Sequence, residues 1–213
     1  MAAEVVKINS ITPESSLITY VAERIKSGQV MGMPTDTFYG LAADPFNLRA
    51  VELIYLVKGR PKYKPLSLLV ESVDQAEELA DLRDSEDFQI LAQKYWPGPL
   101  TIIGKAAGKL PLKVTANTGH VAIRVPAASI PIDVIRKAGV PITATSANVS
   151  GASECTTAAC VREQLGDRIS VIVDGGPSPR SVSSTIVDLT GERWRVIREG
   201  AISAQELTAL LGE

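Results

Sequence analysis

The segment KGRPKYKPL, residues 58–66, places four cationic side chains at alternate positions. Because successive side chains of an extended chain point to opposite sides, this spacing predicts four positive charges along one edge. Two prolines hold the backbone away from a helix that would scatter those charges. The arrangement suits an anionic ligand, although a solvated surface loop has the same composition. The four side chains are Lys58, Arg60, Lys62 and Lys64.

Three further polar segments lie where predicted strands begin or end. PTDTFYG follows the first strand, TATSANVSG follows a strand that ends near Thr145, and SVSSTIVD opens another. Ser146 and Asn148 are two residues apart, so both can face one ligand, and strand or helix termini offer backbone N–H groups to phosphate oxygens. Taken singly, each of these segments is more often an ordinary turn.

A lone arginine interrupts the strand pattern VAIRV, residues 121–125. Val121, Ile123 and Val125 share one face of this strand, while Arg124 projects from the other. An arginine on an interior strand is costly to bury unless a negative group meets it. Arg124 is therefore a candidate ligand for an anionic group.

Standard nucleotide, metal and hydrolase motifs are missing from the sequence. GPLTIIGKA, residues 98–106, resembles a P-loop, but it has one residue too many between its glycines, and Ala106 stands where the magnesium-binding Ser or Thr belongs. No dinucleotide-binding GxGxxG, metalloprotease, kinase or nucleophile-elbow signature occurs. Cys155 and Cys160 match neither a CxxC redox motif nor a zinc site, so we expect buried or idle thiols. His120 follows a glycine, which predicts a turn or the entry of a strand.

Composition indicates an ordinary globular protein. The chain has 213 residues, of which 45% are hydrophobic and 22% charged, enough for one domain with its own core. The net charge of −2 argues against a nucleic-acid coat but leaves room for a local basic cavity. No stretch approaches the ~20 apolar residues of a membrane helix, and no signal-peptide core is present, so we predict a cytosolic protein with no membrane partner.

Helices and strands alternate along the chain, which predicts a single α/β domain with a mixed β-sheet. The helix starts carry recognisable caps, namely Thr12-Pro13-Glu14, Asn47 and the capping box Ser203-x-x-Glu206. Helices are predicted from Leu17 to Ile25, at 48–57, 73–80, 85–95, 132–138 and 157–165, and after Ser203. Strands are predicted at 30–33, 67–70, 100–104, 121–125, 142–145, 170–173, 185–189 and 194–197.

Taken together, the polar segments resemble a known family. PTDTFYGLAAD, KGRPKYKPLSLLV, WPGPLTII, VAIRVP, TSANVSG, STIVDL and VIREGAI occur in the order found in the YrdC/TsaC family of threonylcarbamoyl-adenylate synthases. The resemblance implies the single-domain form, with residues 10–202 as the YrdC-like domain and residues 203–213 as its C-terminal helix. It also implies one twisted mixed β-sheet, flanked by helices, around a large basic cavity.

The same resemblance implies an activity. Members join L-threonine, bicarbonate or CO₂, and ATP into threonylcarbamoyl-adenylate and release pyrophosphate, so this chain is expected to be a nucleotidyltransferase of tRNA modification. A separate tRNA threonylcarbamoyl-transferase complex would then pass the threonylcarbamoyl group to adenosine 37 of tRNA. The nucleophile would be the carbamate of threonine itself. Mg²⁺ would arrive with ATP, because the sequence shows no dedicated metal cage.

On the nucleotide side, the resemblance assigns roles to five residues. Lys58 and Arg60 would hold the triphosphate and steady the leaving pyrophosphate. Arginine suits this task because its planar fork contacts phosphate oxygens in a bidentate manner. Ser146 and Asn148 would hydrogen-bond the nucleotide phosphates, and Arg198 would close over ATP from the last strand.

On the amino-acid side, the resemblance assigns Arg124 to the threonine carboxylate. Thr35, Ser184 and the backbone near Ala144 would complete the pocket and contact the hydroxyl group. Ser183 stands where many family members have an acidic residue, so a role for that acid is not expected here.

Two other functions stay open at this point. A non-catalytic module that binds tRNA or other double-stranded RNA would use a basic concave face and need no ATP turnover. The related domain of hydrogenase-maturation carbamoyltransferases adenylates carbamate, but the acylphosphatase and zinc-finger segments of those proteins are missing from this chain.

Overall fold

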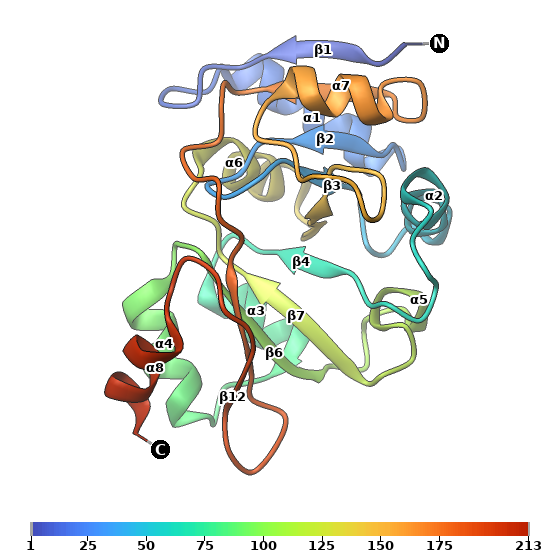
Figure 1. The fold of residues 1–213 in the computed structure, drawn as a ribbon. Coiled ribbons are helices and arrows are strands. Elements are labelled where there is room, and N and C mark those ends of the chain that lie inside the picture. Colours follow the sequence, from blue (N-terminus) through green and yellow to red (C-terminus); the bar gives the residue numbers. More distant parts are fainter. Residues whose placement is uncertain (1, 213) are drawn as a thin grey trace.

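Two mixed β-sheets, rather than the single sheet predicted, organise the chain (Figure 1). The computed structural model describes residues 2–212. The five-stranded sheet has the order β1 (Glu4–Lys7), β10 (Val171–Asp174), β2 (Met31–Met33), β3 (Gly40–Ala42) and β9 (Thr145–Ser146). The seven-stranded sheet has the order β12 (Arg195–Arg198), β11 (Thr185–Asp188), β6 (Leu100–Ala106), β7 (His120–Arg124), β4 (Ser67–Leu69) and β8 (Ile142–Thr143), with β5 (Ala80–Asp81) beside β6.

A change of sheet at Ala144 explains why the single-sheet prediction is wrong. The strand predicted at 142–145 is divided into β8, which pairs antiparallel with β4, and β9, which pairs antiparallel with β3. Between them, the Ala144 N–H donates to the Ser67 carbonyl over 2.9 Å, while the Thr143 N–H donates to the Ala43 carbonyl over 3.0 Å. Residues 143–145 thus contact both sheets. The α/β class and the mixed strand directions are confirmed.

Helices lie close to their predicted positions. They are α1 (Ser15–Lys26), α2 (Leu48–Lys58), α3 (Val73–Leu79), α4 (Glu86–Tyr95), α5 (Leu112–Thr115), α6 (Ser129–Ala138), α7 (Ala158–Leu165) and α8 (Ala204–Leu211). Asn47 caps α2, and the capping box of α8 is present. Helix α1 has Glu14 as its N-cap residue, without a side-chain cap, so the Thr12 cap is wrong. The sequence did not predict β1, β3, β5 and α5.

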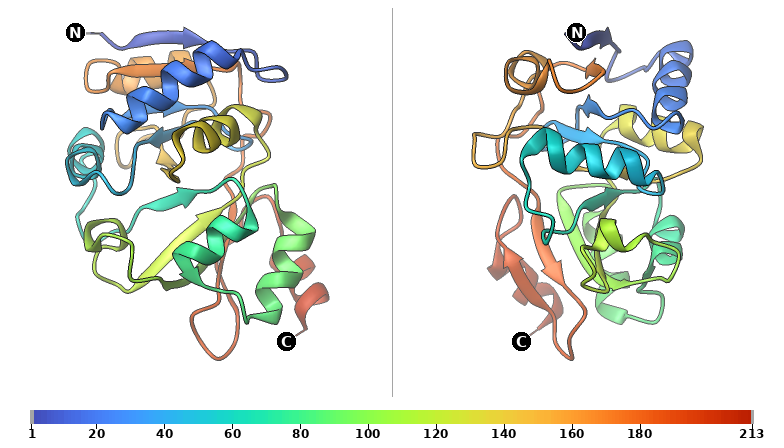
Figure 2. Two further views of the ribbon diagram at one scale, coloured as in Figure 1. Left: turned by 180° about the vertical axis from the view of Figure 1, so that it is seen from behind. Right: turned by 90° about the vertical axis from the view of Figure 1, so that its right-hand side faces the viewer.

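The hydrophobic core has two parts, one for each half of the molecule. Helices α1 and α6 pack together in both views of Figure 2 and bury Val21, Ile25 and Val134 against β2 and β10. A larger cluster fills the space around α2, β6 and β7. Each fully buried aliphatic side chain of this kind contributes roughly 1.5–3 kcal/mol. Among the described residues, no helix combines the length and apolar composition needed to cross a membrane.

Buried polar side chains gather where the two sheets meet. Arg124 ends β7 of the seven-stranded sheet, and residues 35–37 follow β2 of the five-stranded sheet. Each buried polar group needs a partner, because its desolvation is otherwise uncompensated. The junction is therefore the region of the fold in which a polar ligand can be held.

Candidate active site

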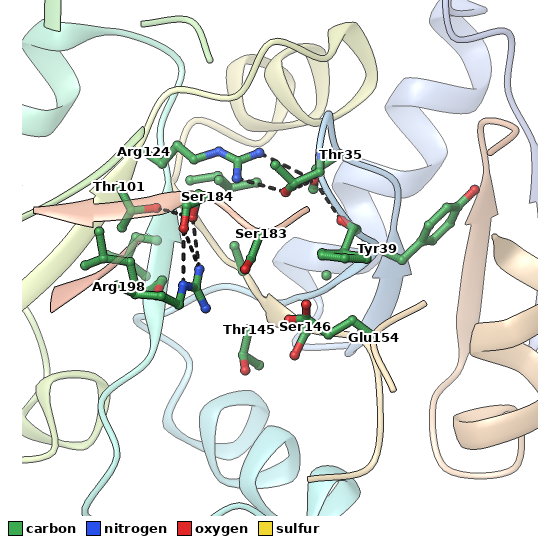
Figure 3. Close-up of a pocket in the computed structure, with 18 of the residues that line it drawn as sticks. Thr35, Tyr39, Thr101, Arg124, Thr145, Ser146, Glu154, Ser183, Ser184 and Arg198 are labelled. Carbon is green, nitrogen blue, oxygen red and sulfur yellow. Dashed lines mark hydrogen bonds between the residues drawn. The ribbon is translucent and has the colours of Figure 1, made fainter. Parts of the chain in front are cut away.

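A cavity of about 210 Å³ lies at the junction of the two sheets (Figure 3). Its wall is formed by the β2–β3 loop, the end of β7, the turn from β8 to β9, and the neighbouring ends of β11 and β12. A single large basic cavity, as the resemblance implies, stays a prediction. Seven predicted site residues line this cavity, namely Thr35, Arg60, Arg124, Ala144, Ser146, Ser184 and Arg198.

Arg124 is held by the loop that follows β2. Its Nη1 donates to Thr37 Oγ1 over 3.0 Å, and its Nη2 donates to Thr35 Oγ1 over 3.4 Å and to Asp36 Oδ1. The guanidinium is nearly completely buried, and this burial lowers the pKa of Arg124, while the neighbouring carboxylate of Asp36 raises it. Arginine remains charged under such conditions. One end of the cavity therefore presents a charged and fixed hydrogen-bond donor, whose carboxylate partner does not line the cavity.

Ser184 and Arg198 form a second polar group in the wall. Ser184 Oγ lies 2.8 Å from Thr101 Oγ1, and Arg198 Nη2 donates to the Ser184 carbonyl over 2.9 Å and to its Oγ over 3.2 Å. Figure 3 shows Ser184 between Arg124 and Arg198. Arg198 is thus held against Ser184, while Arg124 is held by the loop on the other side of the cavity.

Arg60 reaches the cavity because the chain turns sharply after α2. Gly59 has φ of +61° and ends the helix in the left-handed conformation, which glycine adopts without strain. Arg60 Nη2 then donates to the Pro65 carbonyl over 2.9 Å and its Nε to the Lys64 carbonyl over 3.3 Å. These bonds fix the guanidinium beside Thr145 and Ser146 in the wall.

The predicted row of four charges at 58–64 is wrong. Lys58 is the last residue of α2, and residues 61–64 form a turn, in which the Lys64 N–H donates to the Pro61 carbonyl. Lys62 is a surface residue, 3.8 Å from Glu52, and such exposed pairs contribute little. A helix end and a turn send alternate side chains in different directions. Arg60 is the member of the four that lines the cavity.

Lys58 and Asn148 lie behind the cavity wall. Lys58 is only 2% exposed, and its Nζ donates to the Ser146 carbonyl, to the Asn148 carbonyl over 2.8 Å and to Asn148 Oδ1 over 3.1 Å. Asn148 in turn donates from Nδ2 to the Ala152 carbonyl over 2.6 Å. Neither side chain is among those that line the cavity. Together they hold the backbone that presents Ser146.

Comparison with known proteins places the chain in a family. The Sua5/YciO/YrdC family model, described as "Telomere recombination", matches residues 23–200. The chain belongs to this family. The resemblance predicted from the motifs is thereby confirmed.

Two curated relatives in this family carry the name threonylcarbamoyl-AMP synthase. The protein from Pyrococcus abyssi is 36% identical over 196 residues, which are 92% of this chain and 57% of the relative. The protein from Vibrio vulnificus is 35% identical over 187 residues, which are 87% of this chain and 99% of the relative. The chain thus spans little more than half of the first relative and almost all of the second.

A solved structure of the same family supports the fold assignment. The crystal structure of P. abyssi Sua5 complexed with L-threonine superposes with a TM-score of 0.93 at 34% identity, covering 98% of this chain and 61% of that protein. The predicted α/β fold of the family is therefore confirmed. The division into residues 10–202 and 203–213 stays a prediction.

Glu154 is a cavity residue that sequence reasoning missed. Among the described residues it is the one carboxylate that lines this cavity, and it lies beside Ser146 in Figure 3. Its charge raises the pKa values of Lys58 and Arg198, against the larger lowering caused by burial. A glutamate in a turn of mixed composition carries no signal that would identify it from sequence. The cavity of this family member thus combines three arginines with one acid.

The two cysteines are joined in a disulfide bond, so the prediction of buried or idle thiols is wrong in treating them as thiols, although Cys155 is buried. Cys155 lies in the loop after β9, and Cys160 lies near the start of α7, with Cα atoms 5.4 Å apart. This separation is typical of disulfides. The Cys155 carbonyl also accepts the Tyr39 N–H over 2.8 Å. The bond therefore ties the Glu154 loop to α7 next to the cavity.

Activity is expected to fall as the pH rises through about 8. Burial, with a smaller effect from the charge of Arg60, lowers the pKa of Lys58 from 10.5 to about 8. Above that pH the neutral amine can satisfy fewer of the three oxygens that hold the Ser146–Asn148 backbone. The rate of any reaction that depends on this backbone, measured against pH, should show this alkaline limb.

The stability of the fold gives an independent check on Lys58. Between about pH 8 and pH 10.5 the unfolded chain holds the Lys58 proton and the folded chain does not, so the free energy of unfolding rises with pH from this group. The thermal midpoint of the wild type should therefore rise relative to that of Lys58→Met across this range. A constant difference between the two proteins would contradict the lowered pKa.

Proposed function

We propose that this chain is a threonylcarbamoyl-AMP synthase, which joins L-threonine, bicarbonate and ATP into threonylcarbamoyl-AMP and releases pyrophosphate. The observation that carries the proposal is the convergence of Arg60, Arg124 and Arg198 on one cavity. Both substrates that carry permanent negative charge, ATP and the threonine carboxylate, need such cations. Curated relatives with this name, one of them matched over 99% of its length, support the assignment.

In this proposal, threonine binds at the Arg124 end of the cavity. The guanidinium of Arg124 contacts the carboxylate, and the hydroxyl groups of Thr35 and Ser184 and the backbone at Ala144 surround the rest of the amino acid. The threonine amine forms a new C–N bond with the carbon of bicarbonate-derived CO₂, and the proton lost by the amine leaves with the hydroxide lost by bicarbonate as water, which gives the carbamate. L-threonine is the ligand of the superposed Sua5 structure, which supports threonine as the amino acid that binds.

The nucleotide is proposed to lie along Arg60, Ser146 and Arg198. A carbamate oxygen attacks the α-phosphorus, a new P–O bond forms, and the bond to the β-phosphate oxygen breaks, so that the electron pair leaves with pyrophosphate. The arginines offset the repulsion between the two anions, and catalysis is mainly positioning and charge stabilisation. Lys58 and Asn148 contribute by holding the Ser146–Asn148 backbone. Direct contact of Lys58 with phosphate would require its Nζ to leave three oxygen acceptors.

Magnesium is proposed to enter with ATP. The described residues contain no group of three or more side chains arranged to hold a metal ion, and Mg²⁺ usually binds through substrate phosphates and one or two carboxylates. Glu154, with its oxygen ligands on the cavity wall, fits such a role beside a bound triphosphate. The ion would neutralise phosphate charge and keep Glu154 from repelling the nucleotide.

The product defines the proposed partners and compartment. A mixed anhydride of a carbamate and AMP is an activated acyl donor, so a transferase must consume it. We therefore propose a tRNA threonylcarbamoyl-transferase complex as the downstream partner and a cytoplasmic location, where ATP and tRNA are available. A separate double-stranded RNA-binding function is not favoured, because the three arginines converge inside a cavity rather than across a face.

Release of pyrophosphate by the purified protein tests the proposal. With ATP, magnesium and bicarbonate, we expect release to require L-threonine and to be much weaker with L-serine or without an amino acid. Mass spectrometry should detect threonylcarbamoyl-AMP in the same mixture. Pyrophosphate release that ignores both threonine and bicarbonate would contradict the proposed reaction.

A further inference from the structure

Asp36 is a buried acid that the proposed chemistry does not use. It follows Thr35 in the β2–β3 loop and is only 3% exposed. Its Oδ1 accepts from Arg124 Nη2, while its Oδ2 has no hydrogen-bond partner within the described structure. A buried carboxylate is expensive to desolvate, and exchanging such ion pairs for apolar residues is often neutral or stabilising. Stability alone therefore gives a weak reason for Asp36.

The Asp36–Arg124 pair determines which hydrogens of Arg124 remain free. The guanidinium has five N–H donors in a fixed plane. Thr37 takes one hydrogen of Nη1, and Thr35 and Asp36 take those of Nη2. The second hydrogen of Nη1 is left, together with Nε, which has no partner in the described structure. Three consecutive side chains thus fix the plane of the guanidinium; Nε is buried, and the second hydrogen of Nη1 is the one left for a ligand.

Asp36 does not touch the cavity that Arg124 lines. It is not among the residues of the 210 Å³ cavity, whereas its neighbours Thr35 and Thr37 are. It lines a second cavity of about 250 Å³ on the other side of the loop, together with Ser178. Any effect of Asp36 on a ligand of the first cavity is therefore indirect, and Arg124 is the cavity side chain that its carboxylate contacts.

The pair also connects the two sheets. Asp36 belongs to the loop between β2 and β3 of the five-stranded sheet, and Arg124 ends β7 of the seven-stranded sheet. A charged hydrogen bond is stronger and more directional than a neutral one. The ion pair therefore orients Arg124 relative to the opposite wall of the cavity, to which β7 itself is not paired.

We propose that Asp36 is a positioning residue that holds the Arg124 guanidinium in the orientation that receives the threonine carboxylate. The inference rests on the proposed function, in which Arg124 binds that carboxylate. Thr35 and Thr37 supply hydrogen-bond acceptors, and Asp36 supplies the charge that keeps the guanidinium in the loop when no ligand is present. Threonine affinity depends on Asp36 although the residue does not contact threonine.

Steady-state kinetics of Asp36 variants test this inference. We expect Asp36→Ala to raise the KM for L-threonine by about tenfold or more, with the KM for ATP changed by less than about twofold. Asp36→Asn keeps the acceptor but loses the charge, so its threonine KM should lie between those of Asp36→Ala and the wild type. A merely structural role would instead change both KM values together and lower the thermal midpoint in parallel.

A double-mutant cycle isolates the route of the effect. In an Arg124→Gln background, Asp36→Asn should cause no further rise in threonine KM, because Asp36 acts through Arg124. This double variant also removes both buried charges, which keeps the test valid if a single variant folds poorly. Calorimetric titration with L-threonine should reproduce the order of affinities without turnover. Equal effects of Asp36→Asn in both backgrounds would overturn the inference.

Ser178→Ala is the matched control. Ser178 lines the same second cavity as Asp36 and also has an unpartnered side-chain oxygen, Oγ, but makes no contact with Arg124. Its threonine KM should equal that of the wild type, and a rise matching that of Asp36→Asn would overturn the inference in favour of the second cavity. If Arg124→Gln itself leaves the threonine KM unchanged, the proposed function fails. If Arg124→Gln raises the threonine KM but the Asp36 variants leave it unchanged, the inference about Asp36 fails and the proposed function stands.

Discussion

Replacement of Arg60 by alanine is expected to lower pyrophosphate release by roughly 10²–10³-fold, the usual effect of removing one preorganised donor from a charged transition state. Arg60 lines the cavity and is fixed there by the Lys64 and Pro65 carbonyls. No rearrangement is therefore needed before it contacts a phosphate. The measurement is initial rate against ATP concentration at saturating threonine, with the thermal midpoint as a check of folding.

Two variants of the same segment control this experiment. Arg60→Lys keeps the charge but loses the planar fork, so only part of the activity should return. Lys62→Ala removes a cation two residues away whose side chain is 79% exposed and outside the cavity, so its rate should equal that of the wild type. Equal losses in Lys62→Ala and Arg60→Ala would mean that the charge of the segment, rather than the placement of Arg60, is what the reaction needs.

Local patterns in the sequence predicted most of the helices and strands. The Asn47 cap, the capping box at Ser203 and the period-two strand around Ile123 are confirmed because each depends on neighbours within four residues. Strands β1 and β3 were missed, although β2 and β4, which are as short, were predicted. Their side chains pack against distant segments that a local pattern cannot reveal.

The arrangement of charges could not be predicted from spacing alone. The alternation at 58–64 assumed an extended chain, but Lys58 still belongs to α2 and Gly59 reverses the direction of the backbone. In the same way, the strand predicted at 142–145 satisfied one pattern while its two halves pair with different sheets. In each case the backbone at a single residue, Gly59 or Ala144, decides the direction of the side chains that follow it.

The site residues were found mainly through the ordered motifs. Seven of them line the cavity, although Lys58 and Asn148 lie behind its wall. Glu154 and Asp36 were missed as site residues because an isolated acid in a loop has no distinctive spacing. The strand pattern predicted that a buried Arg124 would need a negatively charged partner. In the structure that partner is the chain's own Asp36, a contact between segments 88 residues apart in the sequence.

Arg124 is the residue on which both the proposed function and the role of Asp36 depend. Its position at the end of β7, 6% exposed, prevents the side chain from escaping into solvent. A ligand carboxylate at this site therefore exchanges its hydration for a charged, fixed donor in a region of low dielectric. The same low dielectric makes the loss of that donor costly.

Arg124→Gln is expected to raise the KM for L-threonine at least about 30-fold, since truncating one partner of a buried, hydrogen-bonded charge pair costs about 2–5 kcal/mol. The KM for ATP should change little, because Arg60 and the Ser146 segment lie at the other end of the cavity. Glutamine can still donate to Asp36, which limits the damage to the fold. Arg124→Lys keeps the charge but loses the planar fork, so its KM for L-threonine should lie between that of Arg124→Gln and that of the wild type. An unchanged threonine KM in Arg124→Gln, with normal folding, would show that the carboxylate binds elsewhere.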